Sequence, residues 1–179
     1  MQVATTNSLD AAGSSALLSR AGAALLRVRR ALDFASPAVD LIVRLLVGSV
    51  FFQSGLTKIM SWSSTVSLFE NEYAVPLLPP EIAALMGTGV ELFFPVLLLL
   101  GLGTRFAAFV LFVFNIIAVV SYPDLGEVGL KDHQMWGLLL LVTLLHGPGA
   151  LSLDRLLDRV LGSRLLGPGY GRFFGRRGA

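Results

Sequence analysis

The side chains of this chain best able to do chemistry are ionisable groups inside apolar segments. Arg44 and Lys58 lie in one such segment, and Glu91 lies in the next. In the hydrocarbon core of a membrane, each charge costs roughly 2.5–3.5 kcal/mol on insertion scales. Such a group therefore needs an ionic partner, a route to water or a function such as proton transfer or ligand binding.

Glu91 is the strongest of these signals. It falls about ten residues into its segment, roughly 15 Å deep and near the midplane of a bilayer. Pro95, four residues later, cannot donate the helical hydrogen bond to the carbonyl of residue 91. Two interpretations are open. One is an ion pair with Arg44 that fixes the helix register, and the other is a functional polar site that faces protein, water or a ligand.

Arg44 and Lys58 project from nearly the same face of one predicted helix. Fourteen residues separate them, which is close to four helical turns. Arg44 lies about 9 Å from the inner end of its segment, and Lys58 lies near the outer end. Either long side chain can also snorkel to the nearer membrane surface, so pairing and snorkelling are both open.

Two amides lie at a comparable depth. Asn115 is about 10 Å below the outer surface, and Gln53 is at a similar level. An amide inside a bundle either joins helices or lines a pocket. The predicted polar intramembrane site comprises Arg44, Gln53, Lys58, Glu91, Asn115 and His146, and its outer rim comprises Trp62, His133 and Trp136; no catalytic residue is identified.

The two histidines are not expected to hold a metal together. His133 and His146 are thirteen residues apart on one short predicted helix, a distance of about 20 Å. The chain has no cysteine, which excludes thiolate metal sites. We therefore expect no tightly bound metal or haem. The arginines flank apolar segments, a pattern that indicates membrane anchoring rather than a nucleic-acid surface.

The composition indicates an all-α integral membrane protein. Hydrophobic residues make up 54% of the chain, charged residues only 15%, and the mean hydropathy is +0.73. Four segments approach the length of about 20 residues that a span needs. We predict a four-transmembrane-helix bundle (residues 36–150) between flanking amphipathic interfacial helices in 1–35 and 151–179, the second followed by a basic tail. The spans are predicted at about 38–60, 80–101, 104–122 and 132–150.

The distribution of arginines predicts the orientation. They gather before the first predicted span and after the fourth, whereas the first and third loops are mainly acidic. The aromatic residues Trp62, Tyr73, Tyr122 and Trp136 fall on the side opposite the arginines, as interfacial aromatics do. Both termini are therefore predicted to be cytoplasmic.

Three motifs occur in order along the chain. They are Arg44 with the segment 51–58 (FFQSGLTK), Glu91 with 101–105 (GLGTR), and 147–154 (GPGALSLD). Together they resemble the DoxX family of small four-span membrane proteins of bacteria, over about residues 36–156. The stretch 69–79, with His133 and Trp136, is similar to a subgroup of that family.

The resemblance carries functional expectations. The family takes its name from the membrane component of a thiosulfate–quinone oxidoreductase, and the subgroup accompanies secreted metal-binding peptides and their iron-dependent modifying enzymes. It implies an inner-membrane subunit of a redox or metal-stress system, without stand-alone activity, that contacts a quinone between the first two spans. The alternative is an anchor, exporter or accessory partner of a metal-binding peptide. A homo-oligomer is compatible with either.

Reporter fusions test the predicted topology. A fusion at Ala179 should report the cytoplasm, and a fusion at Ser64 should report the outer side, because basic flanks stay inside. Paired reporters that are active on opposite sides of the membrane give the measurement. A C-terminus outside would contradict the topology.

Overall fold

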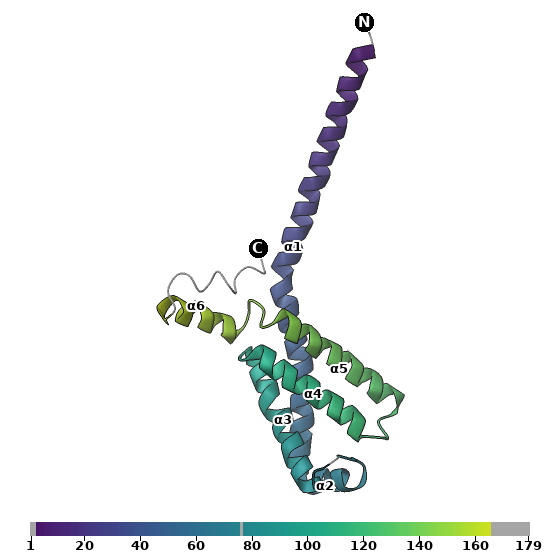
Figure 1. Ribbon diagram of the computed structural model, residues 1–179, viewed down its shortest axis with the longest axis vertical. Helices are drawn as coiled ribbons and strands as arrows, with labels where there is room; N and C mark the ends of the chain where they lie inside the picture. Colours follow the sequence, from purple (N-terminus) through teal and green to yellow (C-terminus); the bar gives the residue numbers. More distant parts are fainter. Residues whose placement is uncertain (1–2, 76, 166–179) are drawn as a thin grey trace.

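The computed structural model describes the backbone of residues 3–75 and 77–165 and the side chains of residues 20–75 and 77–160. Within these residues every regular element is an α-helix (Figure 1). The predicted basic tail beyond residue 165 lies outside the described residues. The helices are α1 (Val3–Met60), α2 (Trp62–Asn71), α3 (Pro80–Leu100), α4 (Thr104–Ser121), α5 (Gly126–His146) and α6 (Leu153–Leu165).

The bundle forms from the C-terminal part of α1 together with α3, α4 and α5. Helix α3 packs against α1 and α4, and α5 packs against α4 and α1 (Figure 1). Small residues let α1 and α3 approach closely, because a Cβ atom at Gly48 would lie 2.9 Å from the Leu99 side chain. The fully buried core comprises Val47, Phe51, Leu98, Ala107, Ala108, Leu111 and Leu140.

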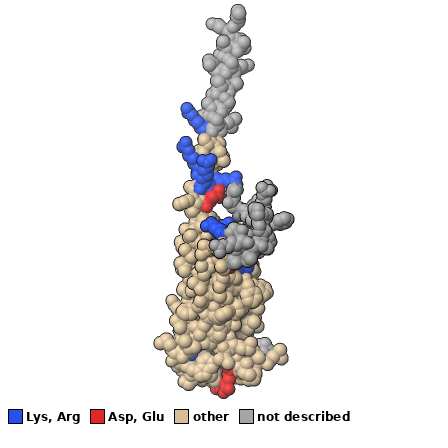
Figure 2. Space-filling model, turned by 90° about the vertical axis from the view of Figure 1, so that its left-hand side faces the viewer, with Lys and Arg blue, Asp and Glu red and all other residues tan. Residues whose placement is uncertain are grey.

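Three helices are long and apolar enough to cross a membrane within the described residues. They are the Arg20–Met60 part of α1, α3 and α4. Helix α5 also has 21 residues, but it is not among these three. Its first turns carry the polar residues Lys131, Asp132 and His133, which lower its mean hydropathy. On the face in Figure 2, charged residues lie toward the two ends and leave an uncharged belt between them. The all-helical, membrane-embedded prediction is confirmed.

The predicted division at residue 36 between an N-terminal interfacial helix and the first span does not coincide with a helix end. Helix α1 continues through Pro37 as one helix of 58 residues. Proline removes one helical hydrogen bond. Residues 16–35 are rich in Ala, Leu and Arg, which are strong helix formers, so the helix propagates across the defect.

A short turn joins α3 to α4 at the predicted inner end. Gly101, at φ 69°, ends α3 in the left-handed conformation that glycine adopts without strain. The Asp154 carboxylate then accepts hydrogen bonds from the backbone N–H groups of Gly103 (2.7 Å) and Thr104 (2.9 Å). It also accepts one from the Thr104 hydroxyl at 2.9 Å. A residue fifty positions away thus caps α4, and this cap ties the chain after α5 to the α3–α4 turn.

Removing this cap should destabilise the bundle. Asp154→Ala leaves the first N–H groups of α4 without their acceptor, a loss of about 0.5–2 kcal/mol. Thermal unfolding in detergent measures it. Asp158→Ala is the control, because Asp158 is exposed on α6 and its loss should stay within about 0.5 kcal/mol. Equal losses in the two variants would contradict the capping role.

Candidate functional site

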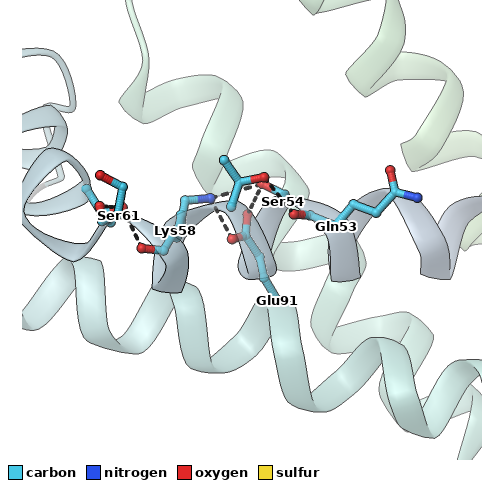
Figure 3. A network of polar contacts seen from close by, with 7 residues as sticks. Gln53, Ser54, Lys58, Ser61 and Glu91 are labelled. Atoms are coloured by element: carbon cyan, nitrogen blue, oxygen red, sulfur yellow. Dashed lines mark hydrogen bonds and ion pairs between the residues drawn. The ribbon is translucent and has the colours of Figure 1, made fainter.

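A buried ion pair joins α1 to α3 in the half of the bundle near α2. The Lys58 Nζ atom lies 2.5 Å from Glu91 Oε2. The Ser54 hydroxyl donates a hydrogen bond to Glu91 Oε1 at 3.1 Å, and Lys58 Nζ also contacts Ser54 Oγ at 3.1 Å (Figure 3). The side chains of Lys58 and Glu91 are only 14% and 7% exposed. The two charges and the hydroxyl therefore satisfy one another away from water.

Local sequence explains this arrangement. Ser54 and Lys58 are four residues apart, so both project from the same face of α1. Between them, Gly55 lets α3 come close, since a Cβ atom there would lie 3.0 Å from the Cβ atom of Glu91. The Thr65 hydroxyl, from α2, donates to the Lys58 carbonyl at 2.9 Å and holds the end of α1. Ser54 was missed in the sequence, although its i, i+4 spacing from Lys58 was available.

Arg44 is not the partner of Glu91, so the predicted ion pair between them is wrong. Arg44 lies at the other end of the bundle, 1% exposed, where its guanidinium donates to the Leu151 carbonyl. It packs against Gly101, whose missing side chain leaves room for Arg44 Nη1. Counting residues gives the depth within one helix, but it does not give the shift of two helices along their axes. That shift places Glu91 beside Lys58.

A second polar group lies between α4 and α5. The Asn115 side chain donates to the His133 carbonyl at 3.0 Å, and its Oδ1 lies 2.8 Å from His133 Nδ1. The Trp136 ring meets the His133 ring edge to face, with centroids 4.7 Å apart. Gly137 leaves space for the amide, because a Cβ atom there would lie 3.2 Å from Asn115 Nδ2. The predicted residues Asn115, His133 and Trp136 therefore form one cluster.

An open groove of about 390 Å³ runs beside this cluster. Its walls are almost entirely apolar, and they come from α4 and α5. Asn115, His133 and Gln134 supply its polar groups. The apolar lining comprises Phe112, Ile116, Val119, Val120, Leu130, Gly137, Leu138 and Leu141.

The other predicted site residues lie outside both clusters. The Gln53 side chain is exposed on α1 and points away from Glu91 (Figure 3). The His146 side chain is 72% exposed, with Nδ1 3.9 Å from an Asp40 oxygen. Trp62 begins α2 and is 40% exposed. The structure thus divides the predicted single polar site into groups at separate places in the bundle.

Aromatic residues that the sequence analysis did not assign to the site lie near the ion pair. The Tyr73 ring stacks between those of Phe69 and Tyr122, with centroids 4.7 and 4.9 Å apart. Burial raises the pKa of Tyr73, and the nearby Glu91 carboxylate adds to the rise. The Tyr122 hydroxyl donates to a Glu72 oxygen at 2.9 Å, and this hydrogen bond raises the pKa of Tyr122. Both phenols therefore stay neutral near pH 7.

Metal ligands are not clustered in the part of the chain that the structure describes. No group of three or more His, Cys, Asp or Glu side chains there could hold an ion. The polar clusters suit hydrogen bonding and charge pairing. The groove suits an apolar molecule with few polar atoms.

Comparison with known proteins identifies the family. The DoxX family profile matches residues 39–123. An uncharacterised protein of Haemophilus influenzae is 33% identical over 129 residues, covering 67% of this chain and 83% of the relative. The chain belongs to the DoxX family. No solved structure matches it. The DoxX match includes Lys58, Glu91 and Asn115, whereas His133 lies beyond it.

Neutralising either member of the Lys58–Glu91 pair should strongly destabilise the bundle. Glu91→Gln or Lys58→Met leaves a buried charge unpaired, which costs about 3–5 kcal/mol. The double variant should recover much of the loss, because no charge is then stranded. Thermal unfolding of all three variants gives the coupling. Glu81→Gln, at the exposed start of α3, should have little effect, and strictly additive losses would contradict the pairing.

Proposed function

We propose that this DoxX protein is a quinone-contacting membrane subunit of a redox system. The groove between α4 and α5 is the observation that carries the proposal. A quinone head group is a flat apolar ring with two carbonyl oxygens. The groove combines long apolar walls with the polar atoms of Asn115 and His133, the usual composition of a small-molecule site.

The location differs from the one that the family resemblance implied. A quinone contact was expected between the first two spans, that is, between α1 and α3. These helices pack closely there, since a Cβ atom at Gly55 would lie 2.9 Å from the Leu92 side chain. A groove with open volume lies between α4 and α5.

His133 can serve both redox states of a quinone. Its Nδ1 atom faces the Asn115 carbonyl oxygen and therefore carries the proton in the neutral ring. The second nitrogen, Nε2, then accepts a hydrogen bond from a quinol hydroxyl. A protonated ring donates from Nε2 to a quinone carbonyl. Quinone reduction takes up two electrons and two protons. A partner oxidoreductase is the proposed electron donor, since the chain has no cysteine for thiol chemistry.

The proposal includes α5 as the fourth span of an inner-membrane protein with cytoplasmic termini. Its 21 residues extend about 31 Å, close to the thickness of the hydrocarbon core. Its polar first turns then lie at the outer surface, beside the acidic loop before them. The same turns carry His133, which places the polar end of the groove near the outer headgroups.

Fluorescence of Trp136 tests quinone binding. In a Trp62→Phe background Trp136 is the remaining tryptophan, and its ring contacts His133. A short-chain ubiquinone analogue added to the full chain in nanodiscs should quench it saturably. His133→Phe removes one hydrogen bond and should weaken binding about three- to tenfold.

His146→Phe is the matched control, since His146 is exposed at the other end of α5. It should leave the affinity unchanged. Quenching that does not saturate, or that is the same in both histidine variants, reports partition into lipid. That result would contradict quinone binding and favour the alternative of a non-enzymatic partner for a metal-binding peptide.

A further inference from the structure

Helix α1 carries an apolar stripe that none of the described side chains of the other helices covers. Its positions alternate in spacings of four and three residues, which is the seven-residue repeat of a coiled coil. Every position is exposed except Ser49, which is half-buried. The stripe comprises Ala21, Leu25, Val28, Leu32, Ala35, Val39, Ile42, Leu46, Ser49, Gln53, Leu56 and Met60. We infer that two copies of this chain pair in parallel along this α1 stripe.

The α1 stripe lies on the side of the helix away from the bundle. Val47, Phe51 and Gly55 are buried against the other helices. At 100° per residue they point roughly 100–180° away from Leu46 and Gln53 around the helix. Within the described residues, folding of one copy therefore leaves the stripe exposed at every position except Ser49.

Lipid cannot cover the N-terminal half of the stripe. Helix α1 runs on beyond the bundle instead of bending along the membrane surface (Figure 1). Residues 20–35 extend about 24 Å along the helix, whereas each headgroup region is only about 5–8 Å thick. Leu25, Val28 and Leu32 are 71%, 56% and 66% exposed in this projecting part. Three large apolar side chains in line and in water need a protein partner.

A second copy fits the α1 stripe better than an unrelated partner. The seven-residue repeat continues without interruption from the projecting part of α1 into the predicted span. Its partner must therefore present the same repeat both outside and inside the membrane. Copies inserted in the same orientation have parallel α1 helices. A two-fold axis along the membrane normal then places each stripe against itself. A sustained seven-residue repeat also gives the left-handed supercoil that such pairs adopt.

Gln53 supports a symmetric parallel pair. It is the one amide in the stripe, and its side chain is exposed at membrane depth. A parallel pair in register places it against the same residue of the second copy. Two amides can then hydrogen-bond to each other inside the hydrocarbon layer. A polar residue at a core position of a coiled coil also fixes register and helix number.

The charges beside the α1 stripe permit this pairing. Arg27 and Arg30 fall at outer positions of the repeat, and blue side chains cluster on the projecting part in Figure 2. Arg29 flanks the stripe but lies 3.9 Å from Asp33 on its own helix, which offsets part of its charge. The remaining repulsion is screened by salt, so pairing should strengthen as ionic strength rises.

The α1 stripe offers enough apolar surface to contribute a large part of a dimer interface. The stripe has eight large apolar side chains, which are now 36–85% exposed. They can bury on the order of 400 Å² in each copy, at about 60–120 Å² per complete side chain. A standard interface buries about 800 Å² per partner. The stripe alone thus supplies about half of that area, and the residues beside it supply more.

Cysteine cross-linking tests the pairing directly, because the chain has no cysteine of its own. Leu25→Cys and Leu32→Cys lie on the stripe. Leu26→Cys is the matched control, adjacent to Leu25 and 56% exposed but off the stripe. With the full chain in native membranes and a mild oxidant to accept the thiol electrons, the stripe variants should form disulfide-linked dimers at least tenfold more efficiently than Leu26→Cys.

Equal cross-linking at Leu25 and Leu26, or none at either, would overturn the pairing. Protection of both introduced thiols from a water-soluble maleimide would then identify the membrane surface as the cover. The mass of the full chain in nanodiscs is a second readout. Leu25→Glu with Leu32→Glu should convert dimers into monomers, and Leu26→Glu should not. This result is independent of quinone binding, since the α4–α5 groove shares no residue with the stripe.

Discussion

The close contact between α1 and α3 is the constraint on which the rest of the bundle depends. Gly48 and Gly55 have no side chain to hold the two helices apart, so side chains of α3 reach the backbone of α1. Lys58 and Ser54 of α1 then meet Glu91 of α3. Inside a lipid bilayer, separating the two charges would leave each without a partner or water. The ion pair therefore holds α1 and α3 in one axial register. Helix α4 follows α3 through a tight turn, and α5 packs on both α4 and α1.

The opposite end of the bundle is held by hydrogen bonds to backbone groups. Asp154 caps α4 from far along the chain, and Arg44 reaches the Leu151 carbonyl. The glycines of the turn after α3 and of the segment after α5 provide the conformations and the space for these contacts. The turn after α3 and the segment after α5, which carry two of the family motifs, therefore form one structural unit.

The groove and the α1 stripe lie on different helices and suit different ligands. The groove is short, apolar and edged by an amide and an imidazole, as a small ring compound requires. The stripe is long, regular and continuous from the projecting part of α1 to its outer end, as another helix requires. Pairing along the stripe would leave the groove open to the membrane.

The sequence by itself determined the all-helical membrane class and the long apolar helices, because hydropathy acts along one helix. It predicted the buried charges, but the ion-pair partner that it offered for Glu91 was Arg44, whereas the structure pairs Glu91 with Lys58. It also divided the chain at residue 36, where α1 in fact continues as one helix because strong helix formers precede Pro37. The partners, the groove and the exposed face of α1 depend on axial shifts and rotations between helices. Packing sets these quantities, so only the tertiary structure decided them.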